Sequence, residues 1–188
     1  MSHTILTKTH TFSTSARSLI PSILKPIICI SVLALSACTS YRDIPANTPE
    51  PTVLQHMGQP NYSCEKADGT RRLIWTTQPN GQYAYATNIS KDGIADKVVS
   101  ILNNENFHKL DHGEWTQHDV VCEFGPPAET GRIGLGEKNE VVWTYRYKQI
   151  NHWNNLMYIY FGRNGDKVTH YHSAPDPRYD PDNFLFFD

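Results

Sequence analysis

The feature that most restricts the fold of this chain is an internal repeat. Residues 53–60 align with residues 120–127, because both segments combine apolar residues with a glycine two positions before a proline. Further along, residues 72–76 align with residues 141–144 around a shared tryptophan, and a turn that contains glycine follows each of them. Markers that recur in the same order indicate two copies of one structural unit.

Each copy predicts a short helix followed by antiparallel strands. In the second copy, Thr116 and Asp119 have the spacing of a capping box before an apolar helical face. The later segments are rich in β-branched and aromatic residues, and the Asn-Gly pair at positions 80–81 is typical of a tight hairpin. We therefore predict an α+β fold of two tandem units, residues 46–105 and 106–175, each with short helices packed on one face of an antiparallel β-sheet.

The N-terminal segment has the layout of an export signal. It carries basic residues and no acidic residue, and an apolar run over residues 27–35 leads into the sequence Leu-Ser-Ala-Cys at positions 35–38. That motif is a lipobox, which predicts cleavage before Cys38 and acylation of its sulfur. We expect a signal peptide over residues 1–37 and a tether over residues 38–45. An ordinary signal peptide with the same cleavage site and no lipid is the alternative.

Removal of the signal peptide leaves an acidic chain. Residues 1–37 contain three of the 17 Lys and Arg residues and none of the 19 Asp and Glu residues, so the remaining 151 residues carry a net charge of −5. This charge disfavours nucleic acid as a partner and adhesion to anionic lipid. We therefore expect attachment to the membrane through the lipid on Cys38. Thr39 after that cysteine favours the outer membrane, with the protein facing the periplasm.

Two cysteines remain once Cys29 leaves with the signal peptide and Cys38 is acylated. Cys64 and Cys122 lie 58 positions apart in a compartment where disulfides persist. A disulfide between them and a free, buried Cys122 are both compatible with the sequence, because spacing alone does not establish the geometry that a bridge needs.

Patterns of catalytic and metal-binding residues are weak. Among the nine histidines, His108 and His112 share a helical spacing and His170 and His172 share a strand face, with His118 near the first pair in sequence. No Cys-x-x-Cys or His-Glu-x-x-His spacing accompanies them, and a tight site needs three or four converging ligands. We interpret the histidines as surface residues and predict no metal and no cofactor. The serines lie in no nucleophile motif, so we also predict that the chain is not an enzyme.

The motifs of the second copy resemble those of the SmpA/OmlA family of small outer-membrane lipoproteins. The resemblance rests on Leu110, residues 116–120, residues 124–127 and residues 142–145, followed by a turn that contains glycine. It covers about residues 46–175, and two tandem copies are also similar to the architecture of β-lactamase inhibitor proteins. The resemblance implies a role beside the machine that assembles outer-membrane β-barrel proteins.

Tryptophans supply the remaining candidates for a binding surface. Trp75 and Trp143 recur in both copies and are predicted core residues, whereas Trp115 and Trp153 have no counterpart in the first copy. Residues that the shared fold does not require are better candidates for contact with a partner. We therefore predict that Trp115 and Trp153 bind a protein partner and that Trp115 projects outward. Residues 176–188 form a predicted C-terminal tail.

These observations predict a non-catalytic lipoprotein of the cell envelope that binds or scaffolds other proteins. An accessory role in outer-membrane β-barrel assembly or in envelope integrity fits the lipobox and the family resemblance. The alternative is a periplasmic enzyme inhibitor or ligand-binding module that uses the face of the tandem repeat.

Overall fold

The computed structural model describes residues 40–149 and 153–179 and shows an α+β fold with two antiparallel sheets. The chain divides between Ala37 and Cys38, and every described residue belongs to the second part. The predicted signal peptide and Cys38 therefore lie outside the described residues, as do residues 180–188 of the predicted tail.

The first sheet has six strands in the order β1-β5-β4-β3-β2, with β6 paired to β4. Its strands are β1 (Thr48–Pro49), β2 (Tyr62–Glu65), β3 (Arg71–Thr76), β4 (Ala84–Ile89), β5 (Ile94–Ala95) and β6 (Val99–Ser100). The central pair, β3 and β4, runs in register from Arg71 opposite Ile89 to Thr76 opposite Ala84.

The second sheet has four strands in the order β10-β9-β8-β7. Its strands are β7 (Glu129–Ile133), β8 (Glu140–Lys148), β9 (Asn154–Tyr160) and β10 (His170–Pro175). The two repeated tryptophans, Trp75 and Trp143, lie in β3 and β8, which confirms that both segments are strands.

Short helices precede each group of strands. The helices are α1 (Glu50–Met57), α2 (Asn104–Phe107) and α3 (Gln117–Phe124), with 3-10 turns η1 (Tyr41–Asp43), η2 (His108–Asp111), η3 (Gly136–Lys138) and η4 (Pro177–Tyr179). The predicted capping box of α3 is confirmed: the Thr116 hydroxyl accepts from the Asp119 N–H at 3.2 Å, and the Asp119 carboxylate accepts from the Thr116 N–H at 2.9 Å. Gly58 and Gly125 end α1 and α3 at φ angles of 75° and 83°, which other residues rarely adopt.

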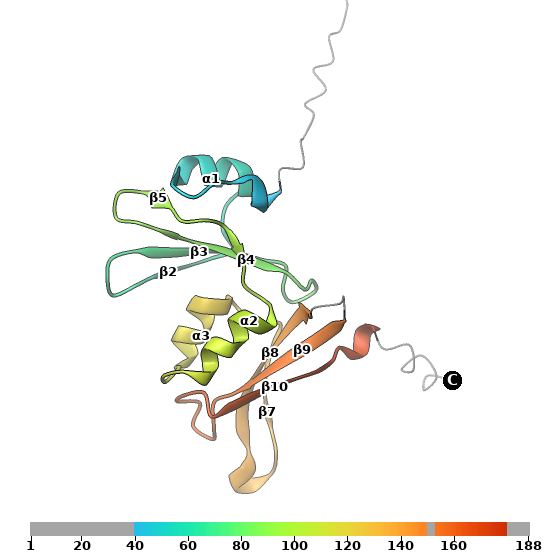
Figure 1. The fold of residues 1–188 in the computed structure, drawn as a ribbon. Helices are drawn as coiled ribbons and strands as arrows, with labels where there is room; N and C mark the ends of the chain where they lie inside the picture. The colour runs from blue at the N-terminus through green and yellow to red at the C-terminus, as the bar shows by residue number, and fades with distance from the viewer. Residues whose placement is uncertain (1–39, 150–152, 180–188) are drawn as a thin grey trace, which may run out of the picture. The chain divides into compact units, whose positions relative to one another are not determined.

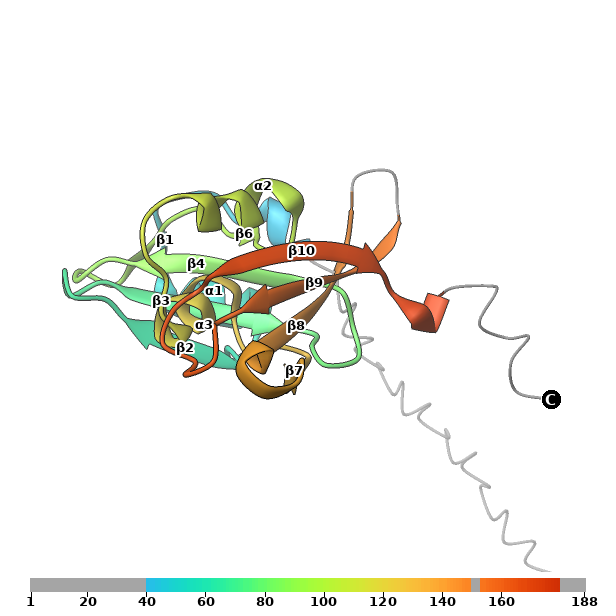
Figure 2. The ribbon, with the colours of Figure 1, turned by 90° about the horizontal axis from the view of Figure 1, so that it is seen from below.

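Helices cover the first sheet on both faces (Figure 1). On one face α1 buries Val53 against Leu73, Trp75 and Ile89. On the other face α2 and α3 lie between the first sheet and the second, so that both sheets share this helical layer (Figures 1 and 2). The expectation of helices on a single face therefore fails for the first sheet, because the helix of the second half packs on it as well.

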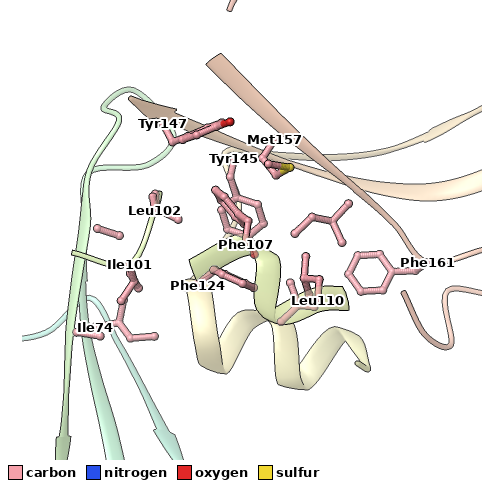
Figure 3. Close-up of a cluster of buried hydrophobic side chains, with 14 residues drawn as sticks. Ile74, Ile101, Leu102, Phe107, Leu110, Phe124, Tyr145, Tyr147, Met157 and Phe161 are labelled. Carbon is pink, nitrogen blue, oxygen red and sulfur yellow. The ribbon is translucent and has the colours of Figure 1, made fainter. Parts of the chain in front are cut away.

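The larger core lies in this shared layer (Figure 3). Phe124 of α3 contacts the ring of Phe107 of α2 at 4.9 Å and that of Tyr145 of β8 at 6.1 Å between centroids. Ile74 of β3 and Met157 of β9 close the core from the two sheets. Each large apolar side chain buried in this way contributes roughly 1.5–3 kcal/mol.

The order of elements is similar in the two halves. Each half has a helix ended by glycine and then an antiparallel meander, β2-β3-β4 or β7-β8-β9. Each half also pairs the residue before its helix with a residue later in the chain: Pro49 pairs with Ile94 of β5 in the first half, and Thr116 forms an isolated bridge with Lys167 in the second. That the two halves superimpose as copies of one unit stays a prediction.

The segment predicted as a tether over 38–45 differs from that expectation wherever the structure describes it. Ser40 and Asp43 form a capping box around η1, and Ile44 is buried in the smaller core. The ring of Tyr41 lies 4.3 Å from that of Tyr85. This segment packs on the fold because burial of the apolar side chains of Tyr41 and Ile44 is favourable.

Arg146 of β8 links segments that are distant in sequence. Its guanidinium donates to both carboxylate oxygens of Asp176 at 2.6 and 2.7 Å, to Glu129 at 2.7 Å and to the carbonyl of Pro79 at 3.1 Å. Burial alone would lower the pKa of Arg146, but the hydrogen bonds and charges of Asp176 and Glu129 outweigh it and raise that pKa. The pair of Arg146 and Asp176 thus anchors the start of the predicted tail to the second sheet.

Two buried tyrosines on β8 provide a matched test of the core. The Tyr145 hydroxyl donates to the Gly125 carbonyl at 2.8 Å, whereas the Tyr147 hydroxyl has no hydrogen-bond partner among the described residues. We expect Tyr145→Phe to lower the free energy of unfolding by about 1–2 kcal/mol, because it leaves that carbonyl unpaired. Tyr147→Phe should leave the free energy unchanged or raise it. Urea denaturation measures both, and an equal loss in the two variants would contradict the assignment.

The ion pairs of Arg146 provide a second test. Asp176→Ala should lower the free energy of unfolding by about 3–5 kcal/mol, because it removes the buried partner of a buried charge. Glu129→Ala is the control, since its side chain is 60% exposed and its loss should cost under about 1 kcal/mol. Thermal denaturation of both variants measures the two losses in the free energy of unfolding. A smaller loss in Asp176→Ala than in Glu129→Ala would contradict the assigned roles.

Candidate functional site

The sequence left open whether the two remaining cysteines form a disulfide, and in the structure they do. Cys64 of β2 and Cys122 of α3 form a disulfide with 5.5 Å between their Cα atoms. Beside it, Arg72 of β3 donates to the Glu123 backbone carbonyl at 3.1 Å and lies 3.2 Å from the Glu123 carboxylate. These bonds attach α3 to the first sheet, so the disulfide has a structural role in the fold.

The expectation that Trp115 projects outward is wrong. Its indole packs against the larger core beside Phe124, and its N–H donates to the His112 carbonyl at 2.9 Å. The loop before α3 turns inward because an indole ring gains more by covering the core than by facing water. A role of Trp115 in partner binding stays a prediction.

Trp153, the other candidate for a partner contact, is exposed. Its exposed fraction is 71%, and it lies immediately before β9, where its carbonyl accepts from the Gln149 N–H at 2.9 Å. A large aromatic side chain this exposed is a candidate contact for a partner. That a partner contacts it also stays a prediction.

The histidines weighed in the sequence lie in different surroundings. His170 and His172 of β10 stack on Tyr160 and Tyr158 of β9, with centroids 4.1 and 5.2 Å apart. His118 of α3 instead lies against the disulfide, with its Nε2 atom 3.4 Å from the sulfur of Cys122. Sequence reasoning missed this group because Cys64 is 54 positions from His118; only the spacing of four between His118 and Cys122 hinted at it.

A further candidate surface is the outer edge of β7, which sequence reasoning did not identify. All five residues of β7 are exposed, and β7 is an edge of the second sheet. The last residue of β7 and the connection after it expose two large apolar side chains, Ile133 at 52% and Leu135 at 90%. An exposed edge strand offers unpaired backbone groups to another chain. Ile133 and Leu135 form an apolar tip that adds surface for a side-chain contact.

The hydrogen bonds of the second sheet show which backbone groups of β7 face outward. The Phe161 N–H donates to the Val141 carbonyl, so the backbone N–H and C=O groups of Val141 point to β9. The side to which these backbone groups point alternates from residue to residue along a strand. Those of Val142 therefore point to β7, where Val142 pairs with Gly131. The neighbours of Gly131 must then direct their backbone N–H and C=O groups to the open side. Those neighbours are Thr130 and Arg132.

Among the described residues, side chains also form hydrogen bonds at two other places along the edges of the second sheet. Beyond the start of β7, the Gln78 side chain takes the place of a strand: its amide donates to the Arg146 carbonyl at 2.6 Å and accepts from the Arg146 N–H at 3.3 Å. On the opposite edge, Tyr171 of β10 donates to Asp111 at 2.6 Å. Burial, followed by that hydrogen bond and the charge of Asp111, raises the pKa of Tyr171 to about 12, so its hydroxyl stays a donor at neutral pH.

Two further findings bear on the placement and kinship of the chain. In the part of the chain that the structure describes, no helix has the length and apolar character needed to cross a membrane. No model of a known protein family matches this chain, and neither the curated proteins nor the solved structures contain a match.

Proposed function

We propose that this chain is a lipid-anchored, non-catalytic binding module of the outer membrane that captures extended segments of other envelope proteins. The observation that carries the proposal is the open edge of β7, whose residues are all exposed and which ends in an apolar tip. Extended peptides bind such edges by adding a strand, with backbone hydrogen bonds supplying affinity and neighbouring pockets or apolar contacts supplying selectivity.

The features that usually protect an edge strand are weak on β7. Natural edges are blunted by prolines, bulges or charged side chains, and β7 has no proline. Its Arg132 is turned back on the fold, donating to the Asn139 side chain and to the carbonyl of Arg163 at 2.7 Å. Its Glu129 is likewise held by Arg146. The charges of the strand are thus occupied within the fold, which leaves the edge accessible.

The lipobox supports an envelope location for this surface. Acylation of Cys38 would hold the domain at the membrane, and η1 begins at Tyr41, only three positions later. Proteins that cross the periplasm unfolded and form β-strands at the outer membrane are clients with the chemistry that strand addition recognises. Assistance to outer-membrane β-barrel assembly is therefore the role we assign.

Strand addition predicts a sharp difference between two substitutions at one position. Thr130→Pro removes an outward N–H that pairs with no strand among the described residues, so the fold should persist while a bound strand loses a hydrogen bond and meets the proline ring. Thr130→Val keeps the N–H and the β-branched shape, and it is the matched control. We expect the proline variant to bind at least about tenfold more weakly, the effect of losing roughly 1.4 kcal/mol.

The measurement is fluorescence anisotropy of a labelled, urea-denatured outer-membrane β-barrel polypeptide, diluted into the full chain purified in mild detergent. Circular dichroism establishes that both variants are folded. Equal binding by Thr130→Pro and Thr130→Val would exclude strand addition at β7. Weaker binding by Leu135→Ser in the same assay would show that the apolar tip takes part.

The anchor is tested separately. Cys38→Ala should release the chain from the membrane fraction, because it removes the sulfur that the lipobox presents for acylation. Fractionation of cells that express the variant measures this, with Cys29→Ala as the control that keeps the lipobox cysteine. A Cys38→Ala protein that remains with the outer membrane would show that the attachment has another cause.

A further inference from the structure

Three potential metal ligands converge beside α3. Cys122 and His118 lie one turn apart on that helix, and Cys64 faces them from β2. The Nε2 atom of His118 is 3.4 Å from the Cys122 sulfur and 3.7 Å from the Cys64 sulfur. The three ligand atoms all lie within 4.8 Å of one another.

These distances suit a tetrahedral cation once the disulfide opens. Zinc bonds to sulfur at about 2.3 Å and to histidine nitrogen at about 2.0–2.1 Å, which places neighbouring ligand atoms about 3.5–4 Å apart. The His118 nitrogen already lies close to that separation from both sulfurs, at 3.4 and 3.7 Å. Only the two sulfurs must move apart, through small rotations of their side chains. Thiolate and imidazole are also the ligands that zinc and other soft or borderline cations prefer.

The group is accessible from solvent. It lines a pocket of about 400 Å³ that also includes Lys66 and Trp115. His118 is exposed and Cys122 is half-buried, whereas Cys64 is 5% exposed. A thiol can therefore approach the Cys122 sulfur, and the pocket leaves room for a fourth ligand such as water on a bound cation.

We propose that Cys64, His118 and Cys122 form a redox-controlled site for zinc or a similar thiophilic cation. In the oxidised state the cysteines are bridged and the site is closed. A dithiol reductant attacks the disulfide, the S–S bond breaks, and the reductant leaves as its own disulfide while two cysteine thiols form. Binding of a divalent cation then releases the two thiol protons, so that two thiolates and the neutral imidazole hold the metal.

Contacts other than the disulfide also attach α3 to the fold. Arg72 bonds to Glu123, and Phe124 lies in the larger core. The Tyr145 hydroxyl donates to the Gly125 carbonyl at the end of the helix. The ligands are thus held by the fold and not by the bridge alone. This inference goes beyond the binding role of β7 and does not depend on it.

The test compares oxidised and reduced protein, using the full chain purified in mild detergent. After treatment with a dithiol and its removal without oxygen, we expect isothermal titration with Zn²⁺ to show one site per chain in the reduced protein and none in the oxidised protein. With Co²⁺ as the probe, the reduced protein should show thiolate-to-metal charge-transfer absorption. Zinc should also raise the melting temperature of the reduced protein.

Single variants assign the ligands. His118→Ala should weaken Zn²⁺ binding at least about tenfold, because one of three protein ligands is lost. His112→Ala is the matched control, since His112 is an exposed histidine outside the group and should bind as the parent does. Cys122→Ser reports the same loss without any need for reduction. Absence of Zn²⁺ binding by the reduced chain, unfolding of the reduced chain even with Zn²⁺, or equal affinity of the His118→Ala variant would each overturn the proposal.

Discussion

Both sheets bury an apolar face against one helical layer, and the rest of the structure depends on this shared contact. Phe124 of α3 lies at its centre, with Phe107 on one side and Tyr145 on the other. The first sheet contributes Ile74 and the second contributes Met157. A sheet with an apolar face must bury that face against another element, so both halves rely on the helices between the two sheets.

A disulfide and polar bonds near the two ends of β3 hold this layered arrangement in register. At the first end, the disulfide of Cys64 and the bonds between Arg72 and Glu123 attach α3 to the first sheet. Beyond the other end, Gln78 binds the backbone of Arg146 in the second sheet. Apolar contacts are non-directional, so these directional bonds restrict how the two sheets can slide.

The same packing explains which surface is left free. The helical layer covers the inner face of the second sheet, Gln78 covers the edge of β8 near Arg146, and Tyr171 ties β10 to η2. The edge of β7 and the apolar tip after it receive no comparable cover from the described residues. The proposed binding surface thus lies where the second sheet ends, and lipid attachment at Cys38 would hold that surface at the membrane.

Local patterns in the sequence predicted the local structure. The capping box of Thr116 and the strands around both tryptophans depend on neighbouring residues, and the structure confirms them. The lipobox is likewise a local signal. Only the tertiary structure decided that Trp115 turns inward, that Cys64 meets Cys122 and His118, and that β7 lies at an edge. These features join residues tens of positions apart, and such contacts are set by how the layers pack, which residue spacing does not encode.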